Sequence, residues 1–536
     1  MLIDRTHPSH TRAGTGIQRV ARAIQQNLTG QAKPVRTFLS WAAVAAFAFS
    51  YLYFIREHSS FSATASDQSG YFNIAQRLLQ GKLIQHVPVI AGVQPPVWNY
   101  DFQRPLGFLV DAQTGMMVPT YPVGFPLHLL AAEPFVSLQY ATLAVNVCLV
   151  AASGILVFAL GRELKLPPWW ALAGVVLLWV CPLFVVDALQ PMSDLPATVW
   201  TLAALWTSLK AHHRWPWGFA AGFAVGVAVL VRPTDLLVMV PVALALGFRK
   251  RAWIALTVGG LPAAAFQAWY NLTLYGRILT TGYGNVGFLF GPRFLVHNFL
   301  HFAFWIPALL SPFVVLPALG LRRSWRESQS AATALIAWAV VLWGFYLFYY
   351  HAGETWWYLR FILPIFPVII LASLVVVRRW CEQSPRCARL KWVPFTVLLA
   401  AIGWQVAVTH YFDIITLKRG DKRYTKTVEW MNTHAPADAI VLQMQMSGSF
   451  TYYTNLAIVR WDFITPKAWT QLQTAAHAAH RPIFATLFDF EFEDPAWKAL
   501  GGDWQLQTRI AEISIWRLAS GPDSPPVNSI ALAGPQ

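Results

Sequence analysis

Residues 138–160 read LQYATLAVNVCLVAASGILVFAL, a run without any Asp, Glu, Lys, Arg or His. A helix of about 20 apolar residues crosses the roughly 30 Å hydrocarbon core of a bilayer, so this segment predicts a transmembrane helix. The composition of the whole chain agrees with that reading. Its 536 residues are 56% hydrophobic and 12% charged, whereas a soluble domain is roughly 45–50% apolar and about 25% charged. These values exclude a water-soluble enzyme.

Similar uncharged windows recur along the chain and predict an α-helical polytopic membrane protein with about eleven transmembrane helices. The fourth to sixth windows are crowded, so one of them could be divided differently. We expect the helices near residues 37–55, 138–160, 168–187, 192–209, 215–231, 234–248, 252–271, 299–320, 331–350, 359–377 and 393–410.

The basic residues predict the orientation in the membrane. The first window follows a basic, polar segment of about 36 residues, too long for an ordinary cleaved signal peptide, so we expect a retained signal anchor with a cytosolic N-terminus. Counted from there, about 21 Lys and Arg fall in cytosolic segments and about eight in the outer loops. We therefore expect a multi-pass protein of the cell inner (plasma) membrane. Because the basic residues lie in short clusters between apolar runs, the net charge of +15 does not indicate nucleic acid.

Four regions follow from this topology. We expect a cytosolic basic N-terminus over residues 1–36 and a transmembrane domain over 37–410, with a long first periplasmic loop at about 56–137. Period-two runs at residues 439–446 and 483–490 predict a small periplasmic α/β domain over 411–520. The Gly, Pro and Ser-rich tail over 521–536 has the composition of a disordered segment.

Acidic residues at the membrane edge gather on the predicted outer side, and such residues are functional candidates because burying their charge in a membrane is costly. Asp67 opens a helical pattern in the long first loop, although it could equally serve only to stabilise the start of that helix. Asp194 lies at the outer start of the fourth window and could also be a helix N-terminal acid. Asp187, seven residues earlier, competes with it for the role of second functional acid.

An ordered series of motifs identifies a family resemblance. The segments DQSGYFNIAQRLLQG at 67–81, YPVGFP at 121–126 and MSD at 192–194 occur in that order. Together they resemble the bacterial branch of the GT-C integral-membrane glycosyltransferases, which includes lipid A aminoarabinose transferases and relatives of protein O-mannosyltransferases. The resemblance covers roughly residues 37–380 and continues in the segments at 218–226, 232–233, 270–271, 276, 281–283 and 360–364.

The resemblance implies an enzyme that transfers a sugar from a polyprenyl-phosphate-linked donor. The acceptor would be a hydroxyl or amine of a lipid, glycan or protein at the outer face of the membrane. In the family the first-loop Asp is the catalytic base, which corresponds to Asp67, and a second acid at the membrane edge corresponds to Asp194. The aminoarabinose transferases have a Lys where this chain has Thr120, so the resemblance does not imply aminoarabinose as the sugar.

The residue types suit this reaction. An acceptor hydroxyl that attacks the anomeric carbon must lose a proton to a positioned carboxylate, for which Asp67 is available. The leaving phosphate needs cations to stabilise its charge. We expect Arg360 and Arg232 to bind this phosphate, with Lys82 as a third candidate that could instead extend along the interface. A single displacement with one base predicts inversion of the anomeric configuration.

Other roles are expected for aromatic residues, and one alternative function remains. Tyr71, Tyr121, Tyr283 and Trp357 are expected to line the acceptor and sugar cavity, although Trp357 also suits an interfacial anchor. We expect no cofactor and no dedicated metal site, and leave open whether a divalent cation assists the two acids. The alternative function is a polytopic transporter of a small or lipidic solute, which usually carries paired charges at the bilayer midplane.

Overall fold

The computed structural model describes residues 42–316, 329–383 and 392–519. The predictions for the N-terminus over 1–36 and the tail over 521–536 concern residues outside these ranges. The chain divides into two compact units, residues 1–57 and 58–536. In the first unit the described residues, from 42 on, form a helix that covers most of the first predicted window. Within this helix the rings of Phe47 and Tyr51 stack with their centroids 6.3 Å apart.

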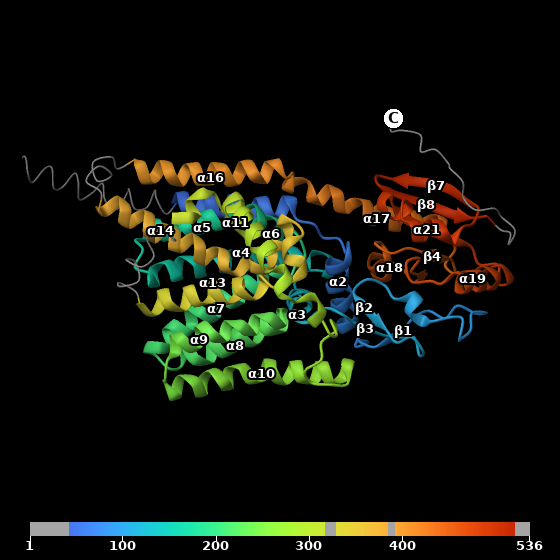
Figure 1. The fold of residues 1–536 in the computed structure, drawn as a ribbon, viewed down its shortest axis with the longest axis horizontal. Coiled ribbons are helices and arrows are strands. Elements are labelled where there is room, and N and C mark those ends of the chain that lie inside the picture. The colour runs from blue at the N-terminus through green and yellow to red at the C-terminus, as the bar shows by residue number, and fades with distance from the viewer. Residues whose placement is uncertain (1–41, 317–328, 384–391, 520–536) are drawn as a thin grey trace, which may run out of the picture. The chain divides into compact units, whose positions relative to one another are not determined.

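Helices of the second unit occupy each of the later apolar windows, and many of them lie along a common direction in Figure 1. Most are α-helices, and several begin at a proline, which fits the first turn because it needs no amide donor there. They are α4 (Leu138–Glu163), α5 (Pro168–Trp179), α6 (Pro182–Leu189), α7 (Asp194–His213), α8 (Trp217–Val231), α9 (Met239–Leu246), α10 (Lys250–Tyr275), α11 (Leu295–Leu310), α13 (Gln329–Tyr346), α14 (Phe366–Gln383) and α16 (Val393–Tyr411). Short 3-10 helices precede α9 and α14, namely η2 (Pro233–Val238) and η8 (Trp356–Ile365).

Five helices in the described ranges are long and apolar enough to cross a membrane by length and composition. They are Leu138–Glu163, Pro292–Leu310, Gln329–Tyr346, Trp356–Gln383 and Val393–Tyr411. The pair α5 and α6 makes a sixth if it counts as one span, with a bend of 64°. The bend falls at Pro182, whose ring cannot continue the hydrogen-bond ladder of α5. The third window is therefore a broken helix, and the total of eleven stays a prediction.

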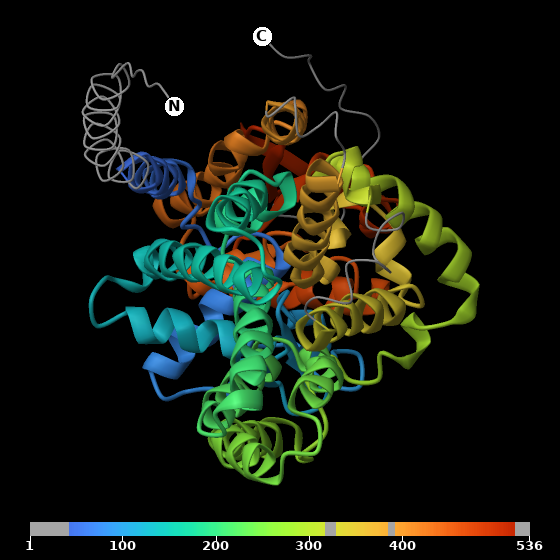
Figure 2. The same cartoon turned by 90° about the vertical axis from the view of Figure 1, so that its left-hand side faces the viewer.

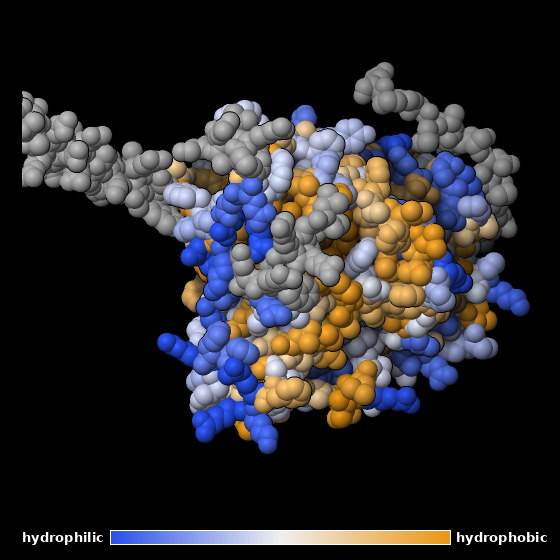
Figure 3. All heavy atoms as spheres, turned by 60° about the vertical axis from the view of Figure 1, so that its left-hand side comes forward, coloured by the Kyte–Doolittle hydropathy of each residue, from blue (hydrophilic) through white to orange (hydrophobic). Residues whose placement is uncertain are grey.

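The surface of these helices is apolar over a wide area. Figure 3 shows hydrophobic side chains gathered over the middle of one face, with hydrophilic side chains toward its margins. An apolar surface of this extent is covered by lipid in a membrane protein. Exposed side chains on α10, α11 and α16 include Ile254, Leu261, Leu272, Phe304, Phe395 and Trp404. The protein is thus a multi-pass membrane protein.

Small residues let two of the helices approach closely. α8 and α10 lie side by side in Figure 1 and Figure 2 and share an extensive contact. At Gly222 of α8 an added Cβ would lie 1.9 Å from the carbonyl oxygen of Leu256 on α10. Gly218 and Gly226 flank it at four-residue spacing, the pattern by which membrane helices bring their backbones together.

The long loop after the first helix contains structure that the sequence did not predict. Beyond the predicted helix α2 (Ser66–Leu79), it forms α3 (Gly124–Ala132) and the 3-10 helix η1 (Tyr100–Gln103). It also contains an antiparallel sheet in the order β1-β3-β2, in which β3 is central. These strands are β1 (Gln85–His86), β2 (Phe108–Val110) and β3 (Met116–Pro119).

The C-terminal region is an α/β sandwich around a five-stranded sheet in the order β5-β4-β6-β8-β7. Strands β5, β4 and β6 pair in parallel, and β8 is antiparallel to both of its neighbours, β6 and β7. The strands are β4 (Ile440–Leu442), β5 (Ala457–Val459), β6 (Ile483–Phe488), β7 (Trp504–Ile510) and β8 (Ile513–Leu518). The helices are α17 (Leu417–His434), α18 (Ser447–Tyr453), α19 (Pro466–Ala478), α20 (Asp489–Phe492) and α21 (Pro495–Leu500).

Both faces of this sheet are buried because its strands alternate between two apolar clusters. Val441 of β4 packs with α17 and α18, while its neighbours Ile440 and Leu442 pack with α19 and α21. The second cluster also takes in side chains from the long loop, namely Ile90, Val93, Trp98 and Phe102. The loop that carries α2 is therefore built into the core of the C-terminal region.

Candidate active site

Asp67 lies in the first turn of α2, where a carboxylate favours the positive end of the helix. Its side chain is 26% exposed, and its Oδ2 lies 2.8 Å from Nη2 of Arg360. Arg360 comes from η8, 293 positions later in the chain. Asp67 is thus both an N-terminal acid of the helix and one half of an ion pair with the membrane domain.

Asp194 lies at the start of α7 and is fully buried. Arg232 donates a hydrogen bond of 2.5 Å from Nη2 to Asp194 Oδ1, and Nη1 of Arg360 lies 3.8 Å from Asp194 Oδ2. Arg360 therefore stands between both acids, and the four side chains form the chain Asp67–Arg360–Asp194–Arg232. They come from α2, η8, α7 and the end of α8, so the site exists only when these elements are packed together.

The charges around Asp67 set its protonation state. Burial alone would raise the pKa of this carboxyl, but the positive charge of Arg360, a hydrogen bond from Tyr121 and the more distant Arg232 together hold the pKa below its ordinary value. Asp67 is consequently ionised at neutral pH and able to accept a proton.

Three of the four aromatic residues expected in the cavity form one group beside Asp67. The rings of Tyr71 and Tyr121 are 5.3 Å apart, and those of Tyr121 and Tyr283 are 6.1 Å apart. The Tyr71 hydroxyl donates to Ser193 Oγ at 2.9 Å. Tyr283 remains 44% exposed and forms the open end of the group. The fourth residue, Trp357, lies with its ring centroid 5.7 Å from the guanidinium carbon of Arg360.

Lys82 is the one predicted site residue that stays apart from this cluster. It is exposed and follows the end of α2, about 20 Å from Asp67 along a helix that rises about 1.5 Å per residue. Within the described chain no ion pair joins it to either acid.

Asp187, the competitor of Asp194, occupies a different position. It is fully buried in α6, and neither of its carboxylate oxygens has a hydrogen-bond partner within the described residues. The acid that holds both arginines is therefore Asp194.

Sequence reasoning missed three side chains that support the site. Ser193 accepts the hydrogen bond of Tyr71, and Ser66 bonds the Tyr121 hydroxyl at 2.6 Å. The ring of Phe361 lies 5.3 Å from the guanidinium carbon of Arg360 and 5.5 Å from that of Arg232. Each of these three residues is a sequence neighbour of Asp67, Asp194 or Arg360. That adjacency is the one feature of the sequence that could have identified them as site residues.

The described residues contain no group of three His, Cys, Asp or Glu side chains that could hold a metal ion. His297 and His301 have the four-residue spacing of some metal sites, but their Nε2 atoms lie 3.0 Å and 3.1 Å from the backbone oxygens of Gly353 and Thr355. These imidazoles connect α11 with the segment that leads into η8.

Residues 122–269 match the model of the dolichyl-phosphate-mannose-protein mannosyltransferase family. A comparison with curated protein sequences finds no match. Two crystal structures of ArnT from Cupriavidus metallidurans, one bound to undecaprenyl phosphate and one in the apo state, are 12% identical to the chain. They have TM-scores of 0.52 and 0.54 and cover 91% of this chain and 99% of theirs.

A third structure extends the comparison. The cryo-EM structure of arabinofuranosyltransferase AftD from Mycobacteria has a TM-score of 0.50 at 12% identity and covers 89% of this chain and 41% of that one. Together the matches agree with the predicted resemblance: residues 122–269 match the mannosyltransferase family model, and the chain shares the polytopic helical GT-C fold of these solved structures.

Proposed function

We propose that this protein is an inverting glycosyltransferase that moves a sugar from a polyprenyl-phosphate-linked donor to an acceptor at the outer face of the inner membrane. The observation that carries the proposal is the pairing of Arg360 with Asp67 on one side and Asp194 on the other. A carboxylate beside two arginines combines a proton acceptor with cations for a phosphate leaving group.

Asp67 is the general base in this proposal. The acceptor hydroxyl oxygen attacks the anomeric carbon of the sugar while its proton passes to Asp67, which is ionised and partly exposed. The bond from the anomeric carbon to the phosphate oxygen breaks, and its electron pair leaves with the phosphate. One displacement at the anomeric carbon inverts its configuration.

Arg360 and Arg232 bind the phosphate, and Asp194 positions them. Asp194 is fully buried, so it acts through the arginines rather than on the acceptor. A bound phosphate forms an ion pair with Arg360, so Arg360 then stabilises the ionised form of Asp67 less strongly. Because Arg360 lowers the pKa of Asp67, donor binding makes this carboxylate a stronger base when an acceptor is to be deprotonated.

Orientation and domain organisation follow the charge distribution. We place the N-terminus in the cytosol and the C-terminal region, with the loop packed into it, in the periplasm or outside the cell. The acceptor is a lipid, glycan or protein present on that side, and the name of the matched family and the undecaprenyl phosphate bound to ArnT support a polyprenyl-type donor.

Transfer assays with purified protein and radiolabelled polyprenyl-phosphate sugars test the proposal. Asp67→Asn should abolish transfer, because loss of a general base costs about 100- to 10,000-fold in rate. Asp101→Asn, at an ion-paired acid of the same loop, should leave transfer unchanged. If Asp67→Asn retains full activity, or if the product keeps the donor's configuration, the mechanism is refuted. Solute uptake by proteoliposomes that is unaffected in Asp67→Asn would instead support the alternative, a transporter.

A further inference from the structure

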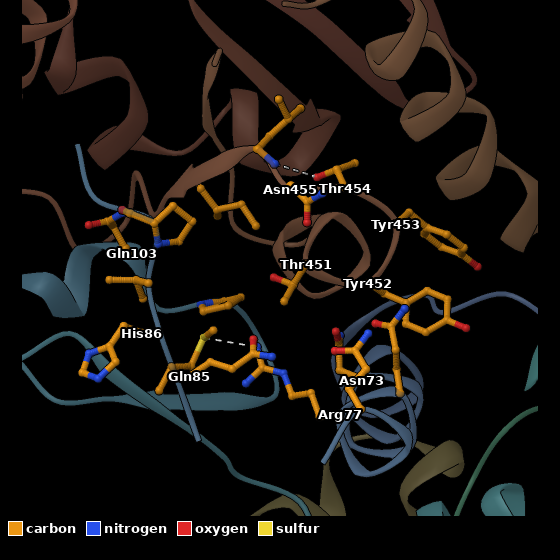
Figure 4. A pocket seen from close by; sticks show the side chains of 18 residues that line it. Asn73, Arg77, Gln85, His86, Gln103, Thr451, Tyr452, Tyr453, Thr454 and Asn455 are labelled. Carbon is orange, nitrogen blue, oxygen red and sulfur yellow. Dashed lines mark hydrogen bonds between the residues drawn. The ribbon is translucent and has the colours of Figure 1, made fainter. Parts of the chain in front are cut away.

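A polar cavity lies between α2 and the C-terminal region, on the side of α2 away from Asp67. Its volume is about 430 Å³, and its walls come from α2, from the β1 segment and from α18 and the residues after it. Figure 4 shows Asn73 and Arg77 of α2 below Thr451 and Tyr452 of α18, with Gln103 at the other side. We call this cavity the outer pocket.

The two faces of α2 separate the outer pocket from the proposed active site. At 100° per residue, Asp67, Tyr71 and Leu78 fall on one face of the helix. Asn73, Gln76, Arg77 and Gln80 fall on another, and all four of them line the outer pocket. Asn73 also donates from Nδ2 to the carbonyl of Gly448 at 2.9 Å, which fixes this polar face against α18.

Arg77 is a buried cation that has no acidic counter-ion among the described residues. Its residue surface is 4% exposed and its guanidinium lies 4.0 Å from the centre of the Phe108 ring. Nη2 reaches only the sulfur of Met117 at 3.9 Å, and Nη1 has no hydrogen-bond partner among the described residues. Burial lowers the pKa of Arg77 to about 10, so the side chain is still charged at neutral pH. No Asp or Glu is among the described residues that line the pocket.

The same cavity also contains a neutral hydrogen-bond acceptor without a partner among the described residues. Gln103 is 2% exposed and donates from Nε2 to the carbonyl of Pro88 at 2.7 Å, but its Oε1 has no hydrogen-bond partner within the described chain. A buried polar group without a partner costs free energy, and a buried unpaired cation costs more. Both groups would be satisfied by a ligand that carries an anion and hydroxyl donors.

We propose that the outer pocket is a binding subsite for an anionic saccharide, with Arg77 bound to a carboxylate or phosphate of the sugar. Gln103 and the side-chain amides of α2 bind its hydroxyls, and Tyr452 offers an aromatic face. This rests on the proposed function in one respect: the saccharide is part of the acceptor. Arg77 lies ten residues from Asp67, about 15 Å along α2, so an acceptor held here reaches the base only if it is longer than one sugar.

Saturation-transfer NMR on the full-length protein in detergent, without donor, tests the subsite. The probes are trigalacturonate, its neutral methyl ester, a hexose 6-phosphate and a neutral hexose. We expect saturable binding of at least one anionic probe and at least about tenfold weaker binding of its neutral counterpart. The anion that binds identifies the source of the charge, a uronic acid or a sugar phosphate. Because no transfer is measured, a negative result here is independent of the proposed transferase activity.

Three variants make the test specific. Arg77→Gln should weaken binding of the anionic probe by at least about tenfold, whereas Lys82→Gln, which removes an exposed charge just beyond the same helix, should not change it. Thr451→Glu places a carboxylate in the pocket and should also abolish binding while the protein keeps its fold. The proposal is overturned if no anionic probe binds, if neutral and anionic probes bind equally, or if folded Arg77→Gln or Thr451→Glu protein binds as the wild type does.

Discussion

Arg360 reaches Asp67 across a distance of 2.8 Å between Nη2 and Oδ2, and this contact joins the helix of the long loop to the membrane domain. The same guanidinium lies 3.8 Å from Asp194, so its positive charge interacts with both acids. The proposed base and the proposed phosphate site therefore share one side chain. A change at Arg360 should alter both proton transfer and donor binding.

The dependence of activity on pH should reveal this shared role. Asp67 has a pKa below its ordinary value because Arg360 and its other partners outweigh the effect of burial, so activity should persist as the pH falls until Asp67 is protonated. In Arg360→Gln the effect of burial prevails, the pKa of Asp67 rises, and the acid limb of kcat/KM should move to higher pH. The rate at neutral pH should also fall by about 100- to 1,000-fold, because a charge-stabilising donor is lost.

Arg293→Gln provides the matched control for that profile. Arg293 is an exposed arginine before α11, and its removal should leave the acid limb in place. An unchanged acid limb in Arg360→Gln would contradict the assignment of Asp67 as the titrating base.

Removal of one member of the buried ion pair between Asp194 and Arg232 should lower the stability of the folded protein. Asp194→Leu leaves two largely buried arginines without their shared partner, and removal of one member of a buried ion pair typically costs about 3–5 kcal/mol. Thermal unfolding in detergent should show a large loss of stability. The double variant Asp194→Leu/Arg232→Met should recover part of it. Additive losses in the double variant would show that the two side chains are not energetically coupled.

The close approach of α8 and α10 predicts an effect at Gly222. In Gly222→Ala the new Cβ would overlap the carbonyl oxygen of Leu256, and overpacking of this kind costs about 1–3 kcal/mol. At Gly403 of α16 no atom of another described element lies within 4 Å of the Cβ position, so Gly403→Ala should be neutral or slightly stabilising. Thermal unfolding of both variants in the same detergent compares them directly, and equal midpoints would refute the packing argument.

Asp421 of α17 should make stability depend on pH. Burial raises the pKa of Asp421 to about 6, with hydrogen bonds from Ser60 and Thr64 and the charge of Arg423 opposing it. In the unfolded chain the pKa is about 4. Between these values the unfolded chain releases its proton while the folded chain keeps it, so stability falls as the pH rises from about 4 to 6 and stays lower above that range.

Asp421→Asn removes this contribution. The midpoint of the variant relative to the wild type should rise between about pH 4 and 6 and then remain level. The matched control is Asp438→Asn, which changes an exposed acid of the same region. A difference that is constant with pH would mean that folding does not raise the pKa of Asp421.

Hydrophobic length and motif order predicted much of the fold and of the candidate site. α4 and α16 begin at the starts of the windows at 138 and 393, because a membrane span must be long and uncharged. The sequence motifs predicted four charged site residues from four separate segments, and the structure brings their charged groups together: Asp67, Asp194, Arg232 and Arg360.

The features that the sequence did not predict depend on contacts between segments far apart in the chain. β1, β2 and β3 have two, three and four residues, too few to show alternation in a sequence. The outer pocket was missed because α2 was recognised by its apolar face, whereas Arg77 lies on the opposite one. Its second wall is formed by α18, and the bond from Asn73 to Gly448 spans 375 positions. No local pattern in the sequence records such a neighbour.

The insertion of Trp98 and Phe102 into the core of the C-terminal region has a consequence for biosynthesis. Trp469 of the same core is made 367 residues after Phe102, which corresponds to about 20 to 70 s of translation at about 5–20 residues per second. During that interval these apolar side chains lack their native partners. The loop that carries α2 is thus among the first parts of the protein to be synthesised and among the last to complete its packing. A chain truncated before its final strands should therefore be recognised by quality-control proteases rather than act as a catalyst.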